Sequence, residues 1–175
     1  YSRLQEVTAN NLANVSTDAF KMDRMTGRTT AGGDYPLPVE AIDLRQGAVR
    51  DTGRDFDLAL EGDGFLVVQT PAGERLTRGG SLRLDAVGRL TDSDGNPVLG
   101  TKGPIVVPHG QFTVQGDGTV LVDNGVLDTL RMETWKDPLT LRKEGAGLYL
   151  AEGPTTAVAS GLTVRQGAIE DGNAD

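Results

Sequence analysis

Hydrophobic and polar residues follow a helical rhythm at the start of the chain. Between residues 1 and 15 the apolar positions recur at spacings of 3, 5 and 3, near one helical face: Leu4, Val7, Leu12 and Val15. Three asparagines crowd the last turn: Asn10, Asn11 and Asn14. Asparagine amides compete for backbone groups in a helix interior but suit helix ends. A helix this short is marginal alone, so we predict that it needs a partner.

The next segment, residues 21–39, has no periodicity. Gly32-Gly33 is a turn signal, and Pro36 and Pro38 favour extended chain. We predict that residues 1–20 form a helical unit and residues 21–39 an extended arm or linker.

From residue 40 the pattern changes to short apolar strands separated by turns, with no helical period up to residue 163. Residues 65–68 form a continuous apolar run, typical of a strand buried on both faces. Asp117-Gly118 and Asn124-Gly125 indicate hairpin turns. The sequence therefore predicts a mainly β chain, with a compact β-sandwich or distorted β-barrel over residues 40–163. The short N-terminal α-helix precedes it on the extended arm.

Two segments that flank this β domain echo each other. Residues 44–51 read LRQGAVRD, and residues 164–171 read VRQGAIED. One interpretation is coincidence between two short amphipathic strands. The other is that they run side by side as a neck, with residues 164–175 as a return strand and four residues holding it together: Gln46, Gly47, Gln166 and Gly167. Such a neck would bring the N-terminal helix close to whatever follows Asp175.

Composition supports short strands and tight turns. The chain has 175 residues, 37% hydrophobic, with 24 glycines and one tryptophan, so Val, Leu and Ile must supply most of the core. A net charge of −8 without any Lys/Arg run argues against nucleic acid and anionic membranes as partners. The absence of cysteine excludes disulfides and thiolate chemistry. No apolar run approaches the ~20 residues that span a bilayer, and nothing resembles a cleavable signal.

The motifs that could indicate ligand binding or catalysis do not have the residue spacing that those functions need. Gly62-x-Gly64 lacks the third glycine of a dinucleotide loop. The start of a calcium loop is present at Asp92, Asp94 and Asn96, but Pro97 stands where that loop needs glycine, so a hairpin turn is favoured. His109 is the single histidine, and no Gly-x-Ser-x-Gly elbow exists to pair it with Ser81 or Ser93. We predict no catalytic residue, no cofactor or metal site, and no small-molecule substrate.

Four segments, in order, resemble signatures of the flagellar basal-body rod and hook family. The first is ANNLANVST at residues 9–17, followed by Phe20-Lys21. The second comprises Gln46-Gly47, Thr52-Gly53, DLAL at 57–60 and GDGF at 62–65. The third is Thr77-Arg78-x-Gly80 with Asp85, Gly88 and Leu90, and the fourth is QGAIE at 166–170. Residues 97–108 are most similar to the proximal-rod branch of the family, with the distal-rod branch second.

The resemblance implies a structural subunit without catalytic activity, exported without a cleaved signal peptide to the flagellar basal body. It implies self-assembly through terminal helices into the axial tube that transmits torque, with other rod and hook subunits and copies of itself as partners. The subunit interface would include Asn10, Asn11, Leu12, Asn14 and Val15. The family's C-terminal helix would begin where this chain stops, so we expect the chain to be monomeric in solution. A small β-domain hydrolase or carbohydrate-binding module is the alternative function.

Ala19 and Gly172 are among the positions that depart from the family pattern. Ala19 stands where glycine is usual, and because alanine takes a positive φ at a cost, we predict that Asp18 adopts that conformation instead. Gly172 stands where serine is usual, which leaves Asn173 as a possible helix N-cap.

Overall fold

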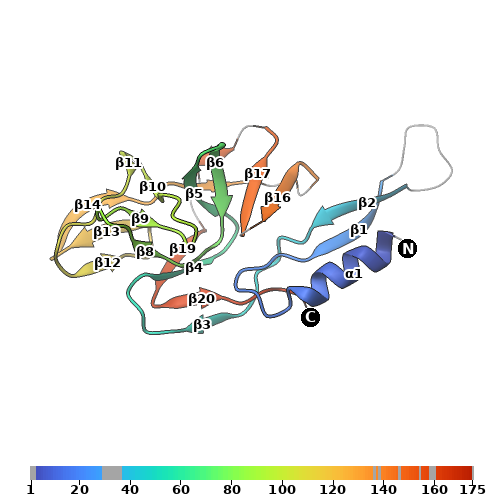
Figure 1. The fold of residues 1–175 in the computed structure, drawn as a ribbon, viewed down its shortest axis with the longest axis horizontal. Helices are drawn as coiled ribbons and strands as arrows, with labels where there is room; N and C mark the ends of the chain where they lie inside the picture. The colour runs from blue at the N-terminus through green and yellow to red at the C-terminus, as the bar shows by residue number, and fades with distance from the viewer. Residues whose placement is uncertain are drawn as a thin grey trace.

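The computed structural model describes residues 3–28, 37–135, 137, 139–145, 147–153, 155–157 and 161–174. Within these residues, one helix, α1 (Arg3–Ala13), is followed by twenty short strands. Figure 1 shows an elongated molecule: a β body at one end, and at the other an arm built from α1 and a two-stranded hairpin. We call the paired strands that join them the neck. The prediction of a mainly β chain with a short N-terminal helix is confirmed.

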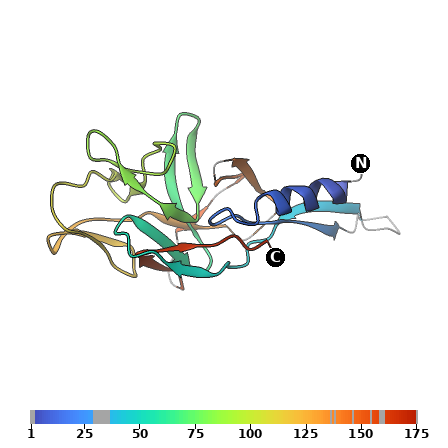
Figure 2. The same ribbon diagram turned by 60° about the horizontal axis from the view of Figure 1, so that its bottom comes forward.

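The arm contains more regular structure than its sequence indicates. Strands β1 (Asp23–Arg28) and β2 (Leu37–Ile42) pair antiparallel, in register from Asp23 opposite Ile42 to Arg28 opposite Leu37. The segment that we predicted as an extended arm is therefore a hairpin, and its Gly32-Gly33 and Pro36 signals lie outside the described residues. Helix α1 lies along this hairpin (Figure 2). Its contacts with β1 explain how so short a helix is held.

The neck and the body account for the remaining strands. The neck consists of β3 (Val49–Asp51) and β20 (Ala168–Glu170), with the adjoining residues 44–48 and 171–174. The body contains β4 (Asp57–Glu61), β5 (Phe65–Thr70), β6 (Gly73–Thr77), β7 (Gly79–Ser81), β8 (Arg83–Leu84), β9 (Leu90–Thr91), β10 (Leu99–Gly100), β11 (Gly103–Pro104), β12 (Phe112–Val114), β13 (Thr119–Val122), β14 (Gly125–Thr129), β15 (Met132–Thr134), β16 (Leu141–Gly145), β17 (Leu148–Ala151), β18 (Thr156–Ala157) and β19 (Thr163–Gln166).

The body is an assembly of small sheets. The largest has the order β16-β17-β6-β5-β15-β18, and two three-stranded sheets have the orders β19-β4-β7 and β12-β13-β14. Over the described residues the sheets do not close into a barrel. The predicted turns are present: Gly118 has φ 90°, and at the other turn Asp123 and Asn124 have positive φ, one residue before the predicted pair.

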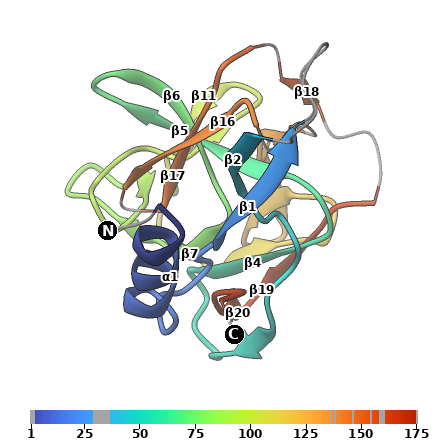
Figure 3. The same ribbon diagram turned by 90° about the vertical axis from the view of Figure 1, so that its right-hand side faces the viewer.

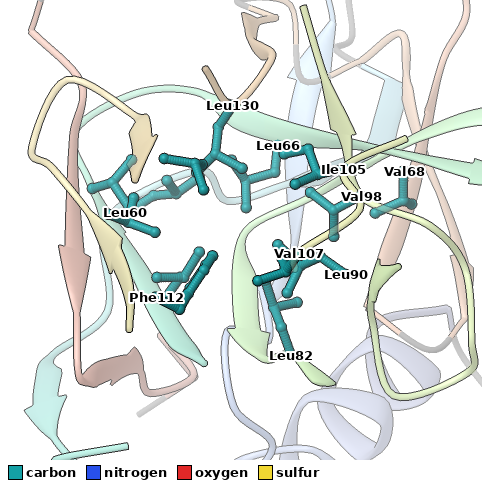
Figure 4. Close-up of a cluster of buried hydrophobic side chains, with 14 of the residues drawn as sticks. Leu60, Leu66, Val68, Leu82, Leu90, Val98, Ile105, Val107, Phe112 and Leu130 are labelled. Atoms are coloured by element: carbon teal, nitrogen blue, oxygen red, sulfur yellow. The ribbon is translucent and has the colours of Figure 1, made fainter. Parts of the chain in front are cut away.

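Strand β5 lies at the centre of the body and is buried on both faces, as its continuous apolar run predicts. Leu66 and Val68 point into the larger apolar cluster, which Figure 4 shows between the sheets. Phe65 and Val67 point to the other face, into a second cluster that includes Tyr149. Alternate residues of a strand face opposite sides, so one run of four apolar residues serves two cores.

Candidate assembly surface

Helix α1 presents an uncovered apolar face. Val7 is its one buried residue, 6% exposed, and faces the arm. The other apolar positions of the predicted stripe are exposed: Leu4 61%, Leu12 72% and Val15 46%. At 100° per residue, Leu4 and Leu12 lie about 80° apart on the helix surface, and Val15 lies in the turn that follows α1. Since single exposed apolar residues are common but a grouped stripe is not, this face is a candidate assembly surface.

The asparagines of α1 bind the arm itself. Asn11 forms two bonds with the backbone of Asp23: its Nδ2 donates to the carbonyl oxygen at 2.9 Å, and its Oδ1 accepts from the amide at 2.9 Å. Asn10 Nδ2 donates to the Asp23 carboxylate at 3.0 Å, and Asn14 Nδ2 donates to Asn10 O at 2.9 Å. The helix therefore joins β1 through side-chain amides rather than apolar packing. Of the five predicted interface residues, Leu12 and Val15 are the two with exposed apolar side chains.

The turn after α1 corrects one prediction. Ala19 itself has a positive φ of 54°, and Asp18 does not. The Ala19 amide donates to the carbonyl oxygen of Glu170 at 2.6 Å, so the return strand fixes the turn in this conformation. Gly172 lies against the same turn: a Cβ there would lie 2.9 Å from the Thr17 carbonyl oxygen. This close approach explains why glycine is suited to position 172.

Asn173 is committed to contacts within the chain. Its Oδ1 accepts from the Met22 amide at 2.8 Å, and its Nδ2 donates to the carbonyl oxygens of Asp43 and Arg45 at 2.9 and 2.8 Å. The Asn173 side chain thus joins the end of the neck to the residues just before β1 and just after β2. The Oδ1 atom that a helix cap would use already accepts from the Met22 amide, and the capping role of Asn173 stays a prediction.

The two echoing segments run side by side. Strands β3 and β20 pair antiparallel, with Val49 opposite Glu170 and Asp51 opposite Ala168. The interpretation of the echo as adjacent strands is therefore borne out for residues 49–51 and 168–170, which Figure 1 shows side by side, whereas Gln166 pairs with Leu58 of β4. Figure 3 shows β20 next to the C-terminus. The last described residues also contact the arm, since the Asn173 amide donates to Phe20 O at 3.0 Å.

The glutamines of the echo serve equivalent purposes in the neck. Gln46 Nε2 donates to Leu60 O at 2.7 Å, and its Oε1 accepts from the Gly62 amide at 2.8 Å. Gln166 Oε1 accepts from the Val114 amide at 3.1 Å, and its Nε2 donates to carbonyl oxygens of Asp55 and Phe112. Each amide satisfies donors and acceptors that the short strands leave unpaired.

The glycines of the echo permit close backbone approach. A Cβ on Gly47 would lie 2.0 Å from the carbonyl oxygen of Asp171, so no side chain fits there. Gly167 has φ 75°, a left-handed conformation that glycine adopts readily, and its amide donates to Asp57 O at 2.8 Å. Gln46, Gln166 and Gly167 thus bond to residues of the body, whereas Gly47 lies against Asp171 within the neck. That these four residues hold the neck together stays a prediction.

A buried ionic cluster that sequence reasoning missed lies where arm, neck and body meet. Glu170 of β20 is 1% exposed and lies between two cations, Lys21 at 2.5 Å and Arg78 at 3.0 Å. Burial lowers the pKa of Lys21, and its hydrogen bond and charge interaction with Glu170 oppose that shift. Burial also raises the pKa of the neighbouring Tyr149. All three charged residues belong to family-like segments, but the sequence offers no signal that they meet.

Residues considered for chemistry are not brought together. Ser81 and Ser93 line one cavity, whereas His109 lines another, so the hydrolase alternative has no triad. Asp92 Oδ1 accepts from the amides of Asp94 and Asn96, which makes the calcium-like segment a hairpin turn, as favoured from the sequence. Across the described positions, no three His, Cys, Asp or Glu side chains gather in a way that could hold a metal ion. Nor does any described helix have the length and apolarity to cross a membrane.

Comparisons with known proteins find similar sequences among flagellar rod and hook proteins. Residues 59–122 match the family described as flagellar hook protein FlgE/F/G D1 domain. The flagellar basal-body rod protein FlgF of Escherichia coli is 40% identical over 66% of this chain and 50% of its own length. FlgF of Caulobacter vibrioides is 32% identical over 96% of this chain and 75% of its own length. The rod protein FlgG of Bacillus subtilis is 30% identical over 82% of this chain and 66% of its own length.

The resemblance inferred from the sequence is thus confirmed, and FlgF relatives reach higher identity than the FlgG relative, as the proximal-rod similarity of residues 97–108 predicts. The chain spans about half the length of the Escherichia coli relative and three quarters of the Caulobacter relative. This chain belongs to the flagellar basal-body rod and hook protein family.

Proposed function

We propose that this chain is part of a structural subunit of the bacterial flagellar basal-body rod. The subunit is exported to the basal body without a cleaved signal peptide. The observation behind the proposal is the exposed apolar face of α1 and of the turn after it, formed by Leu4, Leu12 and Val15, in a chain whose relatives are rod proteins. An apolar face held outside the body on an arm is suited to a neighbouring helix, because helices bury such stripes against one another.

The proposed division of labour follows the three parts of the molecule. Residues 1–20 supply the assembly core, β1 and β2 complete the arm, strands β4 to β19 form an outer domain, and β20 with residues 171–174 returns the chain toward α1. Partners are other flagellar rod and hook subunits and further copies of this protein. The function resides in surfaces rather than in a catalytic site, and the tube that they build transmits torque.

The central experiment places a charge on the apolar face. Leu12→Asp in the full-length protein should abolish rod assembly and motility, because the carboxylate would have to be buried without a partner. Circular dichroism and thermal melting should show an unchanged β body, since Leu12 is 72% exposed. A motile strain that carries this variant would refute the assignment of α1 as an assembly helix.

Two control variants separate this face from other apolar residues. Leu12→Met keeps an apolar helix-forming side chain and should leave motility intact. Val126→Asp adds the same charge at an equally exposed residue of β14, 71% exposed, on the body. We expect the Val126→Asp variant to assemble. Equal loss of motility in both aspartate variants would mean that assembly does not depend specifically on the apolar face of α1.

The isolated chain should be monomeric, because the proposed partner of α1 is another helix. Sedimentation velocity on residues 1–175 at increasing concentration checks this expectation. Stable filaments seen by light scattering would show that α1 and the body suffice for assembly.

A further inference from the structure

The arm and the body meet at a cluster of three buried charges. Lys21 follows the turn after α1, Arg78 lies between β6 and β7, and Glu170 ends β20. Their side chains are 1%, 4% and 0% exposed. Charges buried this deeply are expensive unless each keeps its partners, so their geometry constrains the elements to which they belong.

The Glu170 carboxylate binds all three parts of the molecule. Its Oε1 accepts from Lys21 Nζ of the arm at 2.5 Å and from the Gly47 amide of the neck at 2.8 Å. Its Oε2 accepts from Arg78 Nε of the body at 3.0 Å. One side chain therefore receives three hydrogen bonds, two of them from cations, from segments that are distant in sequence.

Arg78 is itself fixed to the body. Its Nη1 donates to the carbonyl oxygens of Gly62 and Gly64 at 2.8 and 2.6 Å, and its Nη2 donates to Leu60 O at 2.9 Å. A guanidinium held by three backbone carbonyls cannot follow a moving arm. Glu170 is thus bound to a rigid point of the body.

Lys21 provides the matching contact on the arm. Its Nζ donates to Arg45 O at 2.7 Å as well as to Glu170. If the arm swung away from the body, this ammonium would leave both acceptors, and Glu170 and Arg78 would keep a buried site with one cation missing. Glu170 would then lose one of its two cationic donors, and a buried hydrogen bond between charged groups is stronger than a neutral one, so this movement is costly.

Other contacts at the arm root are weaker constraints on angle. Ile42 packs in the smaller apolar cluster, Lys143 lies 4.3 Å from the centre of the Phe20 ring, and the same Lys143 pairs with Asp23 at 2.9 Å. Apolar packing is non-directional, whereas hydrogen bonds between charged groups are short and directional. Directional hydrogen bonds of Asn173 and of the Ala19 amide join the arm to the neck, and the ionic cluster is the directional contact that continues through Glu170 to Arg78 of the body.

We propose that Glu170, held between Lys21 and Arg78, is the positioning residue that sets the orientation of the α1 arm relative to the β body. The three residues act as a lock at the joint, so that the candidate assembly surface is presented at one angle. The lock is a property of the folded chain, and it is independent of which partner covers α1.

The chain has no cysteine, so two introduced cysteines are the only sites for spin labels. We place them at Ala9→Cys on α1 and Val126→Cys on β14, both exposed, and measure the distance distribution between the labels. The otherwise unchanged chain should give one narrow distribution. Lys21→Met should broaden it several-fold, because the arm loses its bond while the Glu170–Arg78 pair remains in the body. Glu170→Gln should broaden it further, because both cations lose their anion.

A second readout separates positioning from general stability. Amide hydrogen exchange of β5 and β6 should stay slow in Lys21→Met, while exchange of the Gly47 and Ala19 amides accelerates at least tenfold. Arg142→Gln is the control, since the Arg142–Glu152 pair is exposed, 64% and 44%, and should leave the distance distribution unchanged.

The proposal fails if Lys21→Met leaves the distance distribution as narrow as in the parent chain. It also fails if the narrow distribution persists while β5 and β6 exchange faster, which would make the cluster a stabiliser of the body only. Should Glu170→Gln not fold, Lys21→Met still decides the question, because that variant keeps the buried pair of the body.

Discussion

The body and the arm are held together by different kinds of interaction. In the body, apolar side chains from many strands form two buried clusters on the two faces of β5. In the arm, Val7 is the one buried residue of α1, and asparagine side chains attach the helix to the backbone of β1. Apolar packing adds many small contributions and tolerates change, whereas a few polar bonds determine geometry but contribute little to total stability. The difference suits a body that must stay folded and an arm that must keep one orientation relative to it.

The largest expected effect tests the apolar side of this comparison. Leu66 is fully buried between the sheets of the body. Leu66→Ala should lower the free energy of unfolding by about 2–5 kcal/mol, because it removes apolar contacts and leaves a cavity. Chemical denaturation measures this loss. Leu84→Ala is the control, since Leu84 is 37% exposed and should cost under about 1 kcal/mol. Equal losses would mean that the body does not depend on the cluster around β5.

A smaller effect tests the polar side. Asn11→Ala removes two hydrogen bonds to the backbone of Asp23, each of which contributes about 1 kcal/mol. We expect α1 to detach locally, seen as faster amide exchange in residues 3–13, while the unfolding midpoint of the body hardly moves. Thr8→Ala is a matched control, because the Thr8 hydroxyl donates only to Leu4 O within the helix. Cooperative loss of the whole fold in Asn11→Ala would contradict the division between arm and body.

The smallest effect has the opposite sign. Ala19 has a φ of 54°, which costs an L-residue roughly 1–2 kcal/mol, whereas glycine avoids most of that strain. Ala19→Gly should therefore stabilise the arm by up to about 1 kcal/mol after the larger unfolded-state entropy of glycine is subtracted. Slower amide exchange at positions 19 and 22 would show the gain in local stability. Asp18→Gly should give no such gain, because the positive φ is not at residue 18.

Local patterns predicted much of the body correctly. The apolar run at residues 65–68 predicted a strand buried on both faces, and the Asp117-Gly118 turn lies where its residues indicate. The repeat of Arg-Gln-Gly-Ala predicted that two distant segments lie side by side, and β3 pairs with β20. These features depend on neighbouring residues or on a repeated pattern, so they can be recognised from the sequence alone.

The arm was harder to predict because its partners are distant in sequence. Strand β1 reads DRMTGR, a mostly polar segment without apolar alternation, so its pairing with β2 gave no signal in the periodicity. The asparagines of α1 were predicted for contacts between subunits, and the structure uses them against Asp23 of the same chain. Their further role at an interface stays a prediction, as do those of Leu12 and Val15.

The feature with which the chain begins, a short helix with a thin apolar stripe, was determined by the sequence alone. So were the mainly β class, the central strand and the family. Only the tertiary structure decided that Ala19 takes the left-handed turn, that Asn173 joins arm to neck, and that Lys21, Arg78 and Glu170 share one buried site. Periodicity records which residues are buried, but it contains no information about which distant charge each buried charge will meet. That choice depends on chain topology, because Lys21 and Glu170 lie 149 positions apart and are joined only when the return strand closes the neck.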